Sequence, residues 1–296
     1  MKNPVMTRRE MMAYSACAVA GLALTSCNSL LESSRTKSSR PGFKLGVCDW
    51  TIGKRTDLAS LEIAKRIGLD GVQVDFGSGQ DKLPLCNPDL QKKFLEEAKK
   101  RNIQIASLAM GVLNEVPYKS DPRAERWVSE AIDVAGAMKA KVILLAFFGN
   151  GDVKNDRKGI DTVVERLKKA APKAEKAGVY LGLESMLNAE QHLEIVRRVG
   201  SPAVKIYYDV ANSHGQGYDI YKEIRLLGKQ ICEFHAKDND DLYGKGSIDF
   251  KEVRRAIDDI GYRGWLIMEG TKMPLGVEES CRYDAEYLRQ IFPSKV

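Results

Sequence analysis

Histidine is scarce in this sequence, and its cysteines are widely separated. The 296 residues include three histidines, His192, His214 and His235. Four cysteines follow residue 42, and the two closest of them, Cys48 and Cys86, are 38 residues apart. This spacing excludes a CxxC metal-binding motif, so we expect these four cysteines to be structural.

The sequence also lacks an apolar run that is long enough to cross a membrane. The run from Met11 to Leu24 has fourteen residues, fewer than the about 20 that a membrane-spanning helix needs. A short apolar run of this kind, preceded by charged residues, is typical of the core of a signal peptide.

The first 42 residues predict an export leader followed by a tether. The pair Arg8-Arg9 resembles a twin-arginine export signal, and Leu24-Thr25-Ser26-Cys27 resembles a bacterial lipobox. We therefore predict a signal peptide over residues 1–27, lipidation of Cys27, and a flexible tether over residues 28–42. The protein would then be an exported, periplasmic lipoprotein that meets the membrane only through this anchor or signal. The alternative is an ordinary signal peptide in which Cys27 has no role.

The positive charge of the chain is concentrated in this leader. The net charge is +6, and residues 1–42 contain six Lys or Arg and two Asp or Glu, which leaves 40 basic and 38 acidic residues in the remainder. A nucleic-acid-binding protein is expected to keep its positive charge on the folded domain. We therefore expect no nucleic-acid partner.

Residues 43–296 are predicted to form one α/β domain, a (β/α)8 TIM barrel. Short apolar segments alternate with longer segments of helical period, a pattern that predicts parallel βαβ units. Strands are expected at Lys44–Cys48, Gly71–Phe76, Gln104–Leu108, Val142–Phe147, Val179–Glu184, Val204–Asp209, Ile231–His235 and Trp265–Glu269. Eight such repeats in about 250 residues match the size of this barrel.

A doubly wound open sheet is the structural alternative. It usually carries a glycine-rich phosphate-binding loop after its first strand. Here the first strand is followed by Asp49-Trp50-Thr51-Ile52-Gly53, which lacks that motif. The sequence therefore favours the barrel.

Four consecutive predicted strands end in a residue that can bind a metal. The gaps between them are 25, 26 and 34 residues, about one β/α repeat each, and the residues are Glu184, Asp209, His235 and Glu269. All four side chains should reach the C-terminal face of the barrel, where the carboxylates would repel one another unless a cation lay between them. We predict one divalent metal. The mostly hard oxygen ligands favour Mn²⁺, with Mg²⁺, Co²⁺ or Zn²⁺ as alternatives.

Several short segments around these strand ends resemble one known family. They are Gly68–Gln73, Leu183-Glu184, Tyr208-Asp209-Val210, Phe234-His235, Gly244–Phe250 and Met268-Glu269-Gly270. Over residues 43–292 the chain resembles the xylose isomerase-like TIM barrels, which include sugar phosphate isomerases/epimerases and ketose 3-epimerases. The resemblance implies that the four strand-end residues bind the metal, and that Glu184 and Glu269 are also the catalytic acid/base groups.

This set of residues suits proton transfer next to a carbonyl. A divalent cation can stabilise an enediolate as a Lewis acid, and a carboxylate on one face can remove a proton that a second carboxylate returns on the other. We expect a metal-dependent sugar isomerase or epimerase with a small carbohydrate substrate. The same enediolate could expel a leaving group, so a lyase that cleaves 3-keto-glycosides is the alternative.

Two positions depart from the sugar epimerases of that family. Those enzymes usually have a histidine where this chain has Asn212, and an arginine where it has Asp238–Asp241. We predict that Lys237 replaces the arginine, because residues two apart on a strand face the same way. The other candidate substrate-binding residues are Asn212, Trp50, Asp75 and Glu115.

Two other classes of protein are weighed against the enzyme. A DNA-repair nuclease of the endonuclease IV type has a related barrel, but it needs several zinc ions and many histidines, which this chain lacks. A non-catalytic sugar-binding lipoprotein would explain Asn212 and the missing arginine. The sequence allows a homo-oligomer without specifying one.

Overall fold

The computed structural model describes residues 42–238, 241–270 and 272–295. The predicted signal peptide over 1–27, with Cys27, and the tether over 28–42, except Gly42, lie outside the described residues and stay predictions. Within the described ranges, no helix combines the length and apolar character that crossing a membrane requires.

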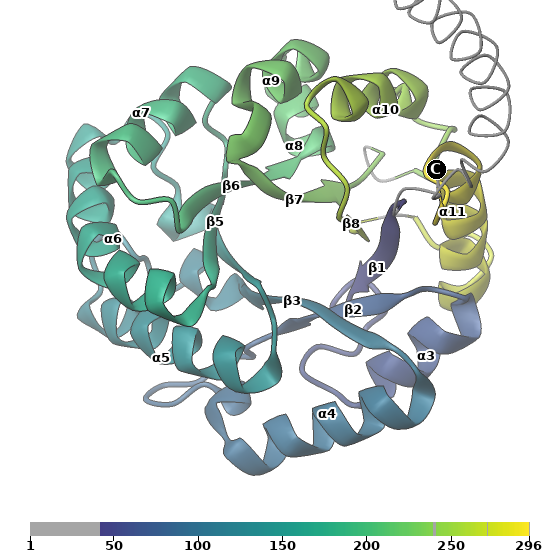
Figure 1. The fold of residues 1–296 in the computed structure, drawn as a ribbon, viewed down its shortest axis with the longest axis horizontal. Helices are drawn as coiled ribbons and strands as arrows, with labels where there is room; N and C mark the ends of the chain where they lie inside the picture. The colour runs from purple at the N-terminus through teal and green to yellow at the C-terminus, as the bar shows by residue number, and fades with distance from the viewer. Residues whose placement is uncertain (1–41, 239–240, 271, 296) are drawn as a thin grey trace, which may run out of the picture. The chain divides into compact units, whose positions relative to one another are not determined.

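Eight parallel strands close into a barrel in chain order, and β8 pairs with β1 to complete the ring (Figure 1). The strands are β1 (Lys44–Cys48), β2 (Gly71–Asp75), β3 (Gln104–Met110), β4 (Val142–Phe147), β5 (Tyr180–Ser185), β6 (Val204–Asp209), β7 (Ile231–Ala236) and β8 (Trp265–Met268). The predicted (β/α)8 barrel is therefore confirmed, and each strand lies within two residues of its predicted bounds.

The helices surround this ring on the outside (Figure 1). They are α3 (Ala59–Ile67), α4 (Pro88–Arg101), α5 (Pro122–Met138), α6 (Arg157–Ala177), α7 (Ala189–Val199), α8 (Val210–Gly215), α9 (Ile220–Leu227), α10 (Phe250–Asp259) and α11 (Val277–Ile291). Single 3-10 turns η1 (Pro84–Cys86), η2 (Gly111–Asn114), η3 (Gly149–Gly151) and η4 (Gly228–Gln230) complete the connections.

Local sequence explains where these helices begin and end. Helix α7 begins with a capping box, in which Asn188 and Gln191 each accept a hydrogen bond from the other's backbone N–H. It ends at Gly200, whose φ of 73° lies in the left-handed region, where glycine has no steric penalty. Helix α6 ends in the same way at Gly178, with φ of 64°.

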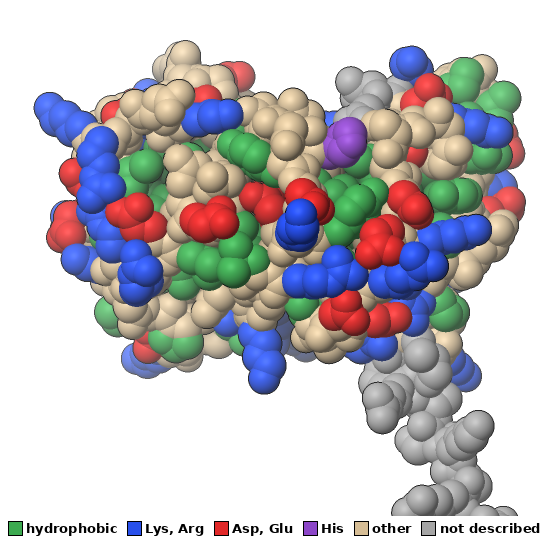
Figure 2. Space-filling model, turned by 90° about the horizontal axis from the view of Figure 1, so that it is seen from above, with side chains coloured by type: hydrophobic (Ala, Val, Ile, Leu, Met, Phe, Trp, Pro, Cys, Tyr) green, Lys and Arg blue, Asp and Glu red, His purple; other side chains and the backbone are tan. Residues whose placement is uncertain are grey.

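The hydrophobic residues form separate clusters on the two faces of the sheet. On β4, Ile143 and Leu145 belong to the large cluster that includes helix residues such as Leu167. The alternate residues Val142 and Leu144 belong to a smaller cluster whose buried members are all strand residues, so this second cluster lies inside the barrel. On the outer face shown in Figure 2, Lys and Arg side chains are interspersed with Asp and Glu.

Candidate active site

The four predicted metal ligands come together at the C-terminal end of the barrel. Glu184 lies near the end of β5, Asp209 ends β6, His235 lies on β7, and Glu269 directly follows β8. One ligand atom from each residue lies within 4.8 Å of the corresponding atoms of the other three. Parallel strands with the same inward orientation at their ends produce this convergence.

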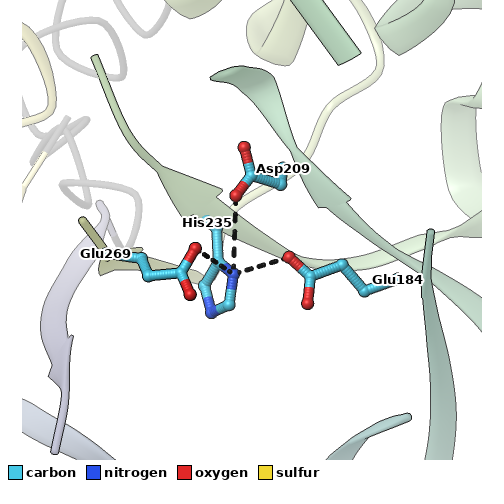
Figure 3. A group of neighbouring side chains, drawn as sticks. All are labelled: Glu184, Asp209, His235 and Glu269. Atoms are coloured by element: carbon cyan, nitrogen blue, oxygen red, sulfur yellow. Dashed lines mark hydrogen bonds and ion pairs between the residues drawn. The ribbon is translucent and has the colours of Figure 1, made fainter. Parts of the chain in front are cut away.

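Nδ1 of His235 is the point that the three carboxylates approach (Figure 3). It lies 2.9 Å from Oε1 of Glu184, 3.5 Å from Oε2 of Glu269 and 3.8 Å from Oδ2 of Asp209. Glu184 and Glu269 stand on opposite sides of the imidazole in this view. The indole N–H of Trp50 donates to the other oxygen of Glu269 at 3.0 Å, so that Glu269 is held from two directions.

The electrostatics of this group favour a positive charge at its centre. Burial disfavours the imidazolium form of His235, but the Glu184 and Glu269 carboxylates outweigh that cost and raise its pKa to about 9. Burial likewise disfavours the carboxylate of Glu269, but His235 and Lys237 outweigh it and lower the pKa of Glu269 to about 2. The protein alone therefore favours a proton on His235 between these carboxylates.

The burial and close packing of these carboxylates also raise the pKa values of Asp209 and Glu184. Burial raises the pKa of Asp209 well above its usual value, and the charges of Glu269 and Glu184 add to that rise. Burial also raises the pKa of Glu184, against the opposing effect of His235. Oδ2 of Asp209 is buried without a hydrogen-bond partner among the described residues. A carboxylate oxygen in this state fits a divalent cation, so these four residues could hold one.

A cavity of about 320 Å³ opens next to the cluster. Three of the predicted substrate-binding residues line it: Trp50, Asp75 and Glu115. Of the four clustered residues, Glu184 and Glu269 line this cavity. The two carboxylates that the sequence analysis assigns to proton transfer are therefore the ones that a bound molecule would meet.

Lys237 and Asn212, the remaining predicted substrate-binding residues, lie beside the cluster rather than in the wall of the cavity. Nζ of Lys237 is 3.5 Å from Oε2 of Glu269. Asn212 lies in α8, a helix that we did not predict, and its backbone N–H donates to Asp209 at 2.7 Å. His214 is in the same helix, and six residues are too few to show a helical period in the sequence.

Arg55 lines the cavity but is not among the predicted substrate-binding residues, because a Lys-Arg pair outside a predicted strand is usually solvated. Its guanidinium lies 2.9 Å from the buried carboxylate of Asp75 and over the ring of Trp50, 5.4 Å from the ring centroid. Burial raises the pKa of Asp75, and Arg55 opposes that rise. Nearby Asp49 is fully buried, and burial raises its pKa to about 7.

A buried polar network lies on the other side of His235. Nε2 of His235 is 2.8 Å from Oε1 of Gln73, and the amide of Gln73 donates to Ser107 and Tyr207. Both hydroxyls donate to Glu233. Gln73 itself is fully buried beneath the cluster.

We predict that His192 makes folding stability depend on pH. It is buried with Nε2 2.9 Å from the hydroxyl of Ser185, and burial lowers its pKa to about 4 although a backbone hydrogen bond with Asn188 opposes the shift. In the unfolded chain its pKa is about 6.5. As the pH falls from 6.5 towards 4, the His192 side chain takes up a proton in the unfolded chain but stays neutral in the folded chain. The free energy of unfolding therefore falls.

The size of this effect can be measured with His192→Gln, which does not titrate. Between pH 7 and pH 5 the wild type should lose about 2 kcal/mol more of its unfolding free energy than the variant does. Denaturant unfolding of both proteins with a chelator present keeps metal binding out of the comparison. An equal loss in the two proteins would contradict the prediction.

Comparison with known proteins places these features in a family. The family model described as "Xylose isomerase-like TIM barrel" matches residues 61–291. The chain is 24% identical over 177 residues to a 2-epi-5-epi-valiolone 7-phosphate 2-epimerase of Actinoplanes, covering 60% of this chain and 65% of that one. It is 30% identical over 127 residues to a D-psicose 3-epimerase of Enterocloster bolteae, covering 40% and 42%. Both matches span less than two thirds of the relative's length.

Solved structures show the same fold at lower sequence identity. A D-psicose 3-epimerase from Clostridium cellulolyticum H10, solved with D-tagatose, superposes with a TM-score of 0.73 at 17% identity, covering 84% of this chain and 99% of that chain. A 3-keto-D-glucoside 4-epimerase from E. coli gives a TM-score of 0.70 at 14% identity with the same coverage. Since the family model matches most of the chain, this protein belongs to the xylose isomerase-like TIM barrel family.

Proposed function

We propose that this protein is a divalent-metal-dependent sugar epimerase or isomerase that removes a proton next to a carbonyl and proceeds through an enediolate. The named relatives of its family are sugar epimerases, which supports an enzyme. The observation that carries the proposal is the position of Glu184 and Glu269, which both line the cavity and face each other across His235.

The position of each residue in the site indicates its role in the reaction. Glu184, Asp209, His235 and Glu269 would hold a divalent cation, which stabilises the negative charge of an enediolate as a Lewis acid. Glu184 lines the cavity and lies 2.9 Å from Nδ1 of His235, so it is placed to remove the proton as a general base. Glu269 would return a proton on the opposite face, and Lys237 beside it would supply that proton or hold a substrate oxygen.

The charge of the cavity indicates an uncharged substrate. Among its described lining residues, four carboxylates (Asp75, Glu115, Glu184 and Glu269) stand against one guanidinium, that of Arg55. Arg55 is already paired with Asp75. A phosphate ester carries about two negative charges and needs several N–H donors or cations. We therefore propose an unphosphorylated ketose or 3-keto-glycoside.

The experiment measures solvent deuterium incorporation at carbon with Mn²⁺-loaded protein. The panel pairs free ketoses with their phosphate esters and adds 3-keto-glycosides. We expect exchange with free sugars or keto-glycosides and a kcat/KM at least about tenfold lower for each phosphate ester, which corresponds to one charge contact of about 1.4 kcal/mol.

The products distinguish the remaining alternatives. Release of the aglycone from a 3-keto-glycoside would assign the lyase reaction, whereas an inverted carbon assigns epimerisation. Tight metal binding without hydrogen exchange in any carbohydrate would contradict the enzyme hypothesis and support a non-catalytic sugar-binding protein. A preference for phosphate esters would overturn the assignment of the substrate's charge but not that of the reaction.

A further inference from the structure

We propose that Gln73 is a positioning residue that keeps a proton on Nε2 of His235, so that Nδ1, which faces the three carboxylates, is the nitrogen that would give up its proton to a cation. Neutral imidazole carries one N–H, and the partner of one ring nitrogen decides which nitrogen keeps it. A metal can bind only the nitrogen that has lost its proton. The inference rests on the metal site of the proposed function. It adds a residue that orients the imidazole of one predicted ligand, His235.

The direction of each hydrogen bond follows from Glu233, at the far end of the network. Its Oε1 is bonded to the hydroxyls of Ser107 and of Tyr207, the latter at 3.0 Å. A carboxyl group carries at most one proton, so it can donate to at most one of these two hydroxyls. At least one hydroxyl therefore uses its own proton at Glu233, whether or not Glu233 is ionised. The oxygen of that hydroxyl can only accept any further hydrogen bond.

The amide of Gln73 is oriented by these two hydroxyls. Its Nε2 lies 2.9 Å from Oγ of Ser107 and 3.0 Å from the hydroxyl oxygen of Tyr207. Because at least one of these oxygens can only accept, the NH2 group must face them and the carbonyl must face His235. A reversed amide would require both hydroxyl protons and leave at least one of the two contacts at Glu233 without a proton.

The carbonyl of Gln73 in turn fixes the imidazole. Oε1 of Gln73 lies 2.8 Å from Nε2 of His235, and it also accepts from the thiol of Cys48 at 3.3 Å. An acceptor at this distance requires the proton on Nε2 of His235. Nδ1, on the other side of the ring, is the atom that approaches Glu184, Asp209 and Glu269.

The barrel register places these residues together. Gln73 on β2 pairs directly with Ser107 on β3, and Tyr207 on β6 pairs with Glu233 on β7. A register shift accompanies each pair. All four side chains are at most 1% exposed, so water does not compete for their hydrogen bonds, and the network can hold one orientation.

Two variants distinguish the hydrogen-bonding role of Gln73 from a role in packing alone. Gln73→Met fills similar space but cannot accept from His235. Glu233→Met removes the acceptor at the far end of the network, frees both hydroxyls to donate, and lets the Gln73 amide reverse. Glu233→Gln is the matched control, because its carbonyl oxygen can still accept from both hydroxyls.

The experiment titrates each metal-free protein with Zn²⁺, which is diamagnetic, by calorimetry and records histidine ¹⁵N spectra of the loaded forms. We expect Gln73→Met and Glu233→Met to bind Zn²⁺ about 10- to 100-fold more weakly than wild type, as is usual when a partner of a metal-binding histidine is lost. The Glu233→Gln protein should bind within about twofold of wild type. The wild-type spectrum should show the His235 proton on Nε2.

Two results would overturn the assignment. If wild type binds Zn²⁺ but both methionine variants bind it equally well with an unchanged His235 spectrum, Gln73 has no positioning role and the metal site stands. If wild type binds no Zn²⁺, the metal site fails and the inference fails with it. The melting temperature of each metal-free variant shows whether it folds, and if one methionine variant does not fold, the other still tests the proposal against the glutamine control.

Discussion

Replacing Glu184 or Glu269 by glutamine is expected to slow carbon–hydrogen exchange about a hundredfold to ten-thousandfold, the usual contribution of a general acid or base. Glutamine keeps the size of the side chain and an oxygen that can approach a cation, but it cannot take up a proton. The measurement is deuterium incorporation into the best carbohydrate of the panel, with the metal content of each variant determined first.

A buried glutamate outside the cluster provides the matched control. Glu223 accepts hydrogen bonds from the Tyr208 hydroxyl at 2.9 Å and from the Ala189 N–H at 2.7 Å, and it does not belong to the cluster. Glu223→Gln should lower stability and keep exchange. If Glu184→Gln and Glu269→Gln keep their metal and also exchange as fast as wild type, the proton-transfer roles are wrong.

Removing the metal should have the second large effect. At a Mn²⁺ concentration of 100 times Kd, the free energy of unfolding should rise by about 2.7 kcal/mol, because the cation binds the folded state alone. A chelator should reverse this increase and stop carbon–hydrogen exchange. The measurement is the unfolding midpoint in denaturant with and without the metal, at one pH.

Asp209→Asn tests whether this stabilisation comes from the cluster. Asparagine keeps an oxygen to accept from the N–H groups of Ala211 and Asn212 that Asp209 caps, so α8 should remain. It replaces the unpartnered Oδ2 with an NH2 group, which cannot bind a cation, and the stabilisation by Mn²⁺ should disappear. Asp219→Asn, at the N-cap of α9, is the matched control and should keep it. Equal stabilisation of both variants would contradict the site.

The strands and the cluster could be predicted because each depends on a repeating pattern. Strand β6 reads Val-Lys-Ile-Tyr-Tyr-Asp, and its apolar character and length are local properties. Once eight repeats imply a barrel, the spacing of Glu184, Asp209, His235 and Glu269 places them on one face by topology alone. The structure brings those four residues together as that argument requires.

The prediction of an export leader depends on a different kind of evidence, namely short motifs that do not recur along the chain. The arginine pair and Cys27 lie outside the described residues, so the export prediction still depends on those motifs alone. Fractionation of cells would test it independently of anything in the barrel.

The sequence by itself determined the order of the elements, the barrel and the four residues at its mouth, because periodicity and spacing are written along the chain. Only the tertiary structure decided that Arg55 pairs with Asp75 and that Lys237 meets Glu269. It alone placed Gln73 under His235. These contacts join residues of different strands and loops, and their partners follow from strand register and side-chain direction, which no local pattern encodes.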